Sequence, residues 1–314
     1  MIDFRYHVVS IVAVFLALAL GLFIGGTSLN GTFASDIKDR TTAVSNKNKE
    51  LSSTNNALQG QLVDEQRFET AAEPYIFRND LSGESVVVVS APGADGGTRS
   101  DVVKALTAAG ATVSGDVRLQ DELLDPAQRT FLDTLTARLD VPGHPVSSGS
   151  GSERAMELLA DVLGIRPASA PVPAAAAARV LSGFEDGNLL TVDGGVAHPA
   201  SLAVLIAPPP PSASADPKLV QAQDALLLEL ARDLDNSAVG AVIAGPVSAA
   251  DSGLLKAARG NKDVTGDVST VDGVDLPRGI IATVLALAEQ AEGGVGSYGA
   301  RSGAKAPLPT PSPS

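Results

Sequence analysis

The first residues that could do chemistry lie in a glycine-rich loop that follows an apolar run. Residues 85–90 read SVVVVS and residues 91–97 read APGADGG. A loop between a strand and a helix is where a doubly wound sheet binds phosphate groups. However, Gly93, Gly96 and Gly97 form neither GxGxxG nor a GxxxxGK[ST] loop. The pattern therefore favours a simple turn over a nucleotide site.

A second loop of this kind, GPVSAAD at residues 245–251, also follows an apolar run. Ser248 is expected to cap the helix that begins there. His198 precedes Pro199 and is not placed near either loop by the sequence, so no Ser/His/Asp triad is indicated. We predict no catalytic residues, and the protein is not expected to be an enzyme.

Candidate metal ligands are few. Four aspartates, Asp263, Asp267, Asp272 and Asp275, could bind a hard cation, but they lack the spacing of an EF-hand and are interpreted as turn residues. The chain has no Cys, three His and two Met, so soft metal ions have few possible ligands. No cofactor is identified. The formal charge of −13 and the pI near 4.6 make nucleic acid an unfavourable partner.

One apolar stretch, Val8–Ile24, contains no charged residue. With the small residues that follow, it is long enough to cross a bilayer, which takes about 20 residues. We predict a membrane anchor at residues 1–29; the alternative is a cleaved signal peptide, whose apolar region is usually shorter. Arg5 precedes the stretch, and Lys38 and Arg40 follow it, so the charges leave the orientation open.

Residues 30–73 are polar and free of proline, with an apolar residue at every seventh position. This pattern predicts a coiled-coil stalk, because a and d positions of a heptad form the seam between two helices. Asn at a positions favours two chains in register, so we predict a parallel homodimer; the alternative is a single helical stalk. The predicted seam is Ile37, Val44, Asn48, Leu51, Asn55, Leu58 and Leu62.

After Pro74, apolar strands alternate with helical segments up to residue 292, which predicts an α/β domain. We expect a doubly wound, mostly parallel sheet with helices on both faces, and a possible lobe boundary at residues 167–178. The tail at 293–314 is rich in Gly, Pro and Ser and is expected to be disordered. The predicted strands are 85–90, 111–117, 202–207, 238–244 and 268–271; the predicted helices are 100–109, 125–139, 153–163, 219–234, 248–259 and 279–290.

Two motifs carry a resemblance to a known family. The first is the opening MIDFRYHVVSIVAVFLALALGLFIG; the second is STVDGVD at residues 269–275, then IIATVLAL at 280–287 and GGVGSYG at 293–299. Both resemble the actinobacterial MctB-like proteins, called copper transporters. The family motif residues are Ser269, Thr270, Val271, Asp272 and Tyr298. This chain has Val295 and Ser297 where family members can carry His.

The resemblance implies a single-pass envelope protein with an extracytoplasmic C-terminal domain and a role in copper efflux or homeostasis, with copper as the transported ion. Related corynebacterial proteins called SteB imply a different role, a scaffold for cell division or envelope maintenance with a membrane partner called SteA. One helix per chain makes no pore without oligomerisation, since a pore needs a helix bundle or a closed barrel.

Overall fold

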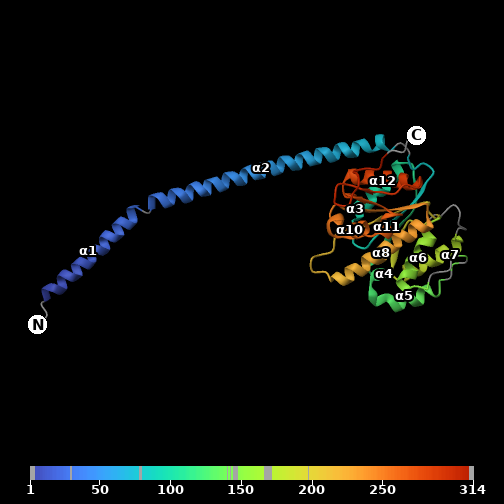
Figure 1. The fold of residues 1–314 in the computed structure, drawn as a ribbon, viewed down its shortest axis with the longest axis horizontal. Helices are drawn as coiled ribbons and strands as arrows, with labels where there is room; N and C mark the ends of the chain where they lie inside the picture. The colour runs from blue at the N-terminus through green and yellow to red at the C-terminus, as the bar shows by residue number, and fades with distance from the viewer. Residues whose placement is uncertain are drawn as a thin grey trace. The chain divides into compact units, whose positions relative to one another are not determined.

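The computed structural model describes residues 4–28, 30–77, 80–139, 141, 143, 148–165, 172–196 and 198–310. The chain forms two compact units, residues 1–65 and residues 66–314. Figure 1 shows the elements of both units. Part of the expected lobe boundary, residues 167–171, lies outside the described residues.

The first unit is helical. Helix α1 (Phe4–Ser28) contains the stretch Arg5–Gly26, which is long and apolar enough to cross a membrane and has no residue buried within the protein. Helix α2 (Asn30–Ile76) follows and continues into the second unit. It ends two residues beyond Pro74, where the sequence placed the end of the stalk.

A seven-stranded sheet forms the centre of the second unit, in the order β3-β2-β1-β4-β5-β6-β7. Only β3 is antiparallel to its neighbour. The strands are β1 (Ser85–Ser90), β2 (Thr112–Leu119), β3 (Leu190–Asp193), β4 (Leu202–Ile206), β5 (Gly240–Gly245), β6 (Ser269–Asp272) and β7 (Ser297–Tyr298).

Helices cover both faces of the sheet (Figure 1). One face is packed by α3 (Gly96–Ala108) and α12 (Pro277–Ala291). The other face is packed by α5 (Arg129–Thr136), α6 (Gly151–Leu163), α7 (Ala174–Asp186), α8 (Pro217–Ser237) and α10 (Leu254–Gly260). The remaining elements are short: α4 (Asp121–Leu124), the 3-10 turn Pro126–Gln128, α9 (Ala249–Ser252) and α11 (Lys262–Thr265).

Consecutive residues of the central strands supply the two cores alternately. In β1, Val86 and Val88 contact the α3 and α12 side, whereas Val87 and Val89 contact the α8 side. Alternation of side chains is inherent to a strand, and burial on both faces explains why these strands are continuous apolar runs. The predicted fold class, a doubly wound and mostly parallel sheet, is confirmed.

The structure differs from the predicted elements in several places. The expected helix 248–259 is divided at Gly253 into α9 and α10, and the helix expected at 125–139 is a short turn followed by α5. Helix α7 begins inside the segment expected to be a lobe boundary, because the five alanines after Pro173 favour a helix and proline is tolerated at a helix start. Strands β3 and β7 were not predicted.

The last crossover is of unusual hand. From β4 through β6 the chain moves along the sheet with α8 and α10 on one face. From β6 to β7 it continues in the same direction, but the connecting α12 lies on the opposite face. This crossover therefore has the opposite hand to β4-α8-β5, although almost all such connections share one hand. Strong local contacts must hold β7 at this edge.

Candidate functional site

The loop at residues 91–97 is a turn whose helix start is already occupied. The Asp95 carboxylate accepts a hydrogen bond from the Thr98 backbone N–H at 2.7 Å and caps α3. This N–H holds the pKa of Asp95 below its usual range. A Cβ placed on Gly93 would contact Pro208 at 3.7 Å, so the loop after β4 closes on this one. These contacts support a turn over an anion site.

The loop at 245–251 is not organised by Ser248. The prediction that Ser248 caps a helix is wrong, because its backbone is already helical and its hydroxyl makes no capping bond. Instead, the Asp275 carboxylate accepts the Val247 N–H at 3.1 Å. Among the described residues, no three His, Cys, Asp or Glu side chains gather where they could hold a metal ion.

The family motif residues come together at the sheet edge, where β6 pairs with β7. Thr270 lies opposite Ser297, and Val271 lies opposite Tyr298. Beneath this edge, the Arg259 guanidinium from α10 forms an ion pair with Asp272 at 2.9 Å, with side chains only 5% and 1% exposed. We call Arg259, Ser269, Thr270, Asp272 and Tyr298 the sheet-edge latch.

Arg259 and Asp272 satisfy each other and hold the segment after β7. Arg259 donates to the Thr270 hydroxyl at 3.1 Å and to the Tyr298 carbonyl at 2.7 Å. Asp272 accepts the backbone N–H groups of Ala300 at 2.9 Å and Arg301 at 3.2 Å. A buried ion pair with all its hydrogen bonds made fixes geometry and leaves no free group for a substrate.

Other contacts complete the latch. The Ser269 hydroxyl accepts bonds from the Gln290 side chain at 3.0 Å and the Gly296 N–H at 3.1 Å. The Tyr298 hydroxyl donates to Glu289, and burial, together with this bond, raises the pKa of Tyr298 above its usual value. Gly299 has a φ of +126°, and a Cβ there would lie 2.3 Å from Asp272. Only glycine fits this position.

The latch overturns the expectation that residues 293–314 are disordered. Residues 293–310 are described: Tyr298 and Pro309 are buried, and the Gly299 and Lys305 N–H groups donate to Ala306 and Ser297. The segment is poor in apolar residues, so composition suggested a free tail. Its order comes from backbone hydrogen bonds to β6, Arg259 and Asp272. Residues 311–314 lie outside the described residues.

A groove of about 890 Å³ lies between α8, α10 and α11, and we call it the α8–α10 groove. Its volume is in the usual range for ligand sites, about 300–1,000 Å³. Residues on one face of α8, from Pro217 to Arg232, form one wall, and Pro211 in the proline-rich loop forms part of the rim. Proline has a fixed φ, which keeps that rim rigid.

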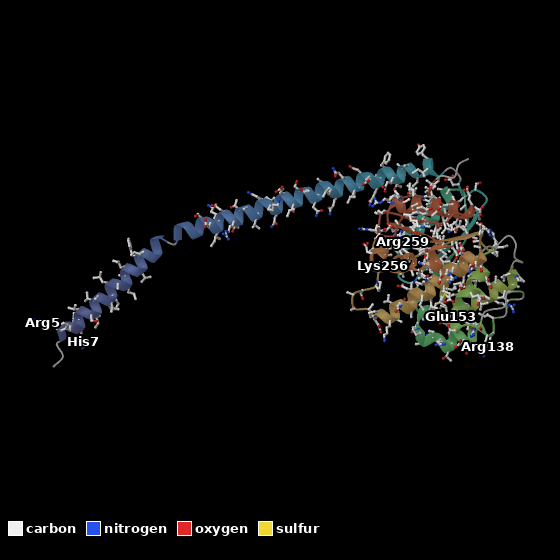
Figure 2. All side chains as sticks on the ribbon, viewed as in Figure 1. Arg5, His7, Arg138, Glu153, Lys256 and Arg259 are labelled. Atoms are coloured by element: carbon white, nitrogen blue, oxygen red, sulfur yellow. The ribbon has the colours of Figure 1, made fainter. Side chains whose placement is uncertain are left out.

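The α8 wall of the groove carries charges of both signs, because it contains Arg232 as well as two carboxylates, whereas the opposite wall is positively charged. Asp224 and Glu229 lie on α8, whereas Lys256 and Lys262 lie on α10 and α11; Figure 2 labels Lys256. Burial raises the pKa values of Asp224 and Glu229. Among the described residues, no ion pair joins these carboxylates to these lysines. A ligand with a cationic and an anionic group could contact both walls.

Soft metal donors do not converge in the described part of the chain. His7 lies on α1 in the first unit, and His198 is exposed, with Nδ1 3.3 Å from the Pro199 carbonyl. Met156 is fully buried in the core. Met1 and His144 lie outside the described residues.

The structure leaves the predicted seam residues on the exposed surface of α2, from Ile37 to Leu62. Arg259 and Glu289, the partners of the family motif, were not predicted from the sequence. Arg259 stands directly before Gly260 at the end of a helical pattern, where a basic residue is common for its interaction with the helix dipole. No local signal pointed to Asp272, 13 residues later.

Known proteins align with nearly all of this chain. The family described as "Copper transport outer membrane protein, MctB" matches residues 1–309. "Copper transporter MctB" of Mycobacterium tuberculosis (strain ATCC 25618 / H37Rv) is 27% identical over 97% of this chain and 98% of its own length. The protein of the same name from Mycobacterium leprae (strain TN) is 28% identical over the same shares of both chains. This protein belongs to the MctB family.

Proposed function

We propose that this protein is a membrane-anchored envelope protein that acts in copper efflux or copper homeostasis. The observation that carries the proposal is the match over residues 1–309 to a family described by copper transport and the outer membrane. The apolar stretch Arg5–Gly26 supports a membrane anchor, since it is long enough to span a bilayer and exposes its whole surface.

The second unit is proposed to lie outside the cytoplasm. The family description, which names the outer membrane, supports an envelope location. A thiol-labelling experiment tests this orientation cleanly because the chain has no Cys. Lys104, an exposed residue of α3, would be replaced by Cys and treated in intact cells with a membrane-impermeant maleimide. Labelling is expected in intact cells; labelling only after lysis would contradict the orientation.

Binding, rather than copper coordination, is the role proposed for the α/β unit. Among the residues that the structure describes, His198 and Met156 do not converge on a common point with other soft donors, and copper prefers imidazole and sulfur ligands. The α8–α10 groove offers an alternative, a surface with charged walls for a partner or an envelope ligand. A single apolar helix makes no pore by itself, so transport would require an oligomer or a partner.

Deletion of the gene tests the copper role directly. The deletion strain is expected to accumulate copper and to grow poorly at raised copper concentrations, with growth in raised zinc as the control. Complementation with the full chain should restore growth, and a chain lacking residues 1–29 should not. Unchanged copper content and sensitivity would contradict the proposal. Abnormal septation in that case would support a division scaffold with a SteA-like membrane partner.

A further inference from the structure

The exposed part of α2 presents an apolar stripe at heptad spacing. Ile37, Val44, Leu51, Leu58 and Leu62 are each between 52% and 63% exposed. They lie on one face of the helix, since residues separated alternately by three and four positions share a face. An apolar stripe of this length is typical of a helix that packs against a partner.

The polar residues within this stripe can be buried against an identical helix. The Thr41 hydroxyl donates to the Ile37 carbonyl at 2.7 Å, so it is already satisfied. The side-chain amides of Asn48 and Asn55 make no hydrogen bond within the described chain, and both residues are exposed. In a parallel pair each amide faces its own copy, whereas in an antiparallel pair it would face an apolar residue.

The same helix face serves a different purpose beyond Leu62. The next seam position is Glu65, which is exposed, and the boundary between the two units falls there. Continuing the heptad, Glu69, Ala72 and Ile76 are partly buried within residues 66–314. The Glu69 carboxylate is 18% exposed and lies 3.7 Å from the Arg278 guanidinium of α12.

We propose that residues 37–62 of α2 pair in parallel and in register with those of a second copy, and that the pairing ends at Leu62. It ends there because one helix face cannot contact two partners: from Glu69 onward this face packs on its own α/β unit. The seam is therefore limited to under four heptads, and the two α/β units are not joined by a continuous coiled coil. This inference does not depend on the copper role.

The apolar helix agrees with a parallel pair. Ala13, Ala17, Gly21 and Gly25 recur at every fourth position of α1. A Cβ added to Gly21 or Gly25 would meet nothing within 4 Å, so this face is open. Small residues at this spacing let membrane helices approach closely. The proposal rests on α2, and α1 supplies a compatible second contact.

Single cysteines in this Cys-free chain test both the seam and its end. Three variants of the full chain, Val44→Cys, Asn46→Cys and Ala72→Cys, would be oxidised mildly in native membranes. Gel electrophoresis without reductant would then separate the covalent dimer from the monomer. Val44 is a seam residue away from the middle of the stripe, so its copies meet only in a parallel pair. Asn46 points away from the seam, and Ala72 continues the heptad beyond its proposed end.

The Val44→Cys variant is expected to form a covalent dimer at least about tenfold faster than the other two, because a disulfide needs Cβ atoms about 4 Å apart. Equal rates for Val44→Cys and Asn46→Cys would overturn the seam. Equal rates for Val44→Cys and Ala72→Cys would overturn its end at Leu62. Sedimentation of the detergent-solubilised full chain should give a dimer, and a monomer would contradict the proposal.

Discussion

The exposed part of α2 and the segment at 293–310 are both poor in apolar residues, but they obtain their structure differently. The C-terminal segment is held by groups of its own chain, with Asp272 accepting two of its backbone N–H groups. The apolar residues of the stripe from Ile37 to Leu62 are exposed, and no group in the described part of the chain covers them. Composition alone does not distinguish a segment with partners in the same chain from one whose partners lie elsewhere.

The largest loss of unfolding free energy is expected from substitutions in the sheet-edge latch. In an Asp272→Ala variant, Arg259 would remain buried without its carboxylate, and removal of one partner from a buried ion pair costs about 3–5 kcal/mol. The free energy of unfolding, measured in urea, should fall by that amount, and residues 293–310 should become sensitive to protease. Asp251→Ala is the control, since Asp251 is half-exposed and 3.9 Å from Arg301; a loss equal to that of Asp272→Ala would contradict the latch.

The sequence predicted the sheet but not its edges. Central strands such as β1 and β4 are buried on both faces and are therefore continuous apolar runs. Strand β7 has two residues, and β3 has only one fully buried residue. Edge strands of this kind depend on tertiary contacts, for example Asp193 of β3 with Arg99 at 2.7 Å, and these contacts leave no periodic pattern.

The candidate site was predicted in part. Resemblance to a family selected Ser269, Thr270, Asp272 and Tyr298, and the structure brings these residues together. It did not select Arg259, because a surface cation at a helix end and a buried ion-pair partner look alike in sequence. The α8–α10 groove is formed by helices distant in sequence, so only the tertiary structure reveals it.

Removing the hydroxyl of Tyr298 should lower the free energy of unfolding by less than Asp272→Ala does. This variant tests the hold on the C-terminal segment at a single atom. Tyr298→Phe deletes the hydrogen bond to Glu289, and bonds to charged groups contribute about 1.5–3 kcal/mol. The free energy of unfolding should fall by about 1.5 kcal/mol. In the matched Tyr75→Phe variant, the ring is 84% exposed and no change is expected; equal losses would show that the bond does not hold β7.

Substitution of a half-buried carboxylate without sufficient positive charge around it should stabilise the fold, whereas substitution of Asp272 should destabilise it. Burial first, and then the carboxylates of Glu229 and Glu157, raise the pKa of Asp233 to about 7, although Arg232 opposes them. The folded protein thus binds a proton that the unfolded chain releases near pH 4, and stability falls as the pH rises from about 4 to 7.

The Asp233→Asn variant removes the free-energy cost of ionising this carboxyl group in the folded protein. At pH 8 its free energy of unfolding should exceed that of the parent by on the order of 1 kcal/mol, since solvent screens partly exposed charges, and the difference should shrink toward pH 4. Urea unfolding at several pH values measures this. Asp186→Asn, an exposed carboxylate at the end of α7, is the control. A constant difference across the pH range would contradict the raised pKa.

The smallest change in the free energy of unfolding is expected from a substitution in the exposed stripe of α2. Val44 is 60% exposed, whereas Val88 of β1 is fully buried. Val88→Ala should lower the free energy of unfolding of the α/β unit by roughly 2 kcal/mol, from lost apolar burial and a cavity. Val44→Ala should change it by less than about 0.5 kcal/mol, because alanine favours a helix and no contact is lost within the chain. If a second copy covers the stripe, Val44→Ala should instead weaken association of the two chains, which sedimentation at several protein concentrations would detect.

The opposite outcome is a loss of unfolding free energy that does not vary with protein concentration. Such a loss would mean that Val44 has its partner within the same chain, and the α2 stripe would then no longer differ from the C-terminal segment.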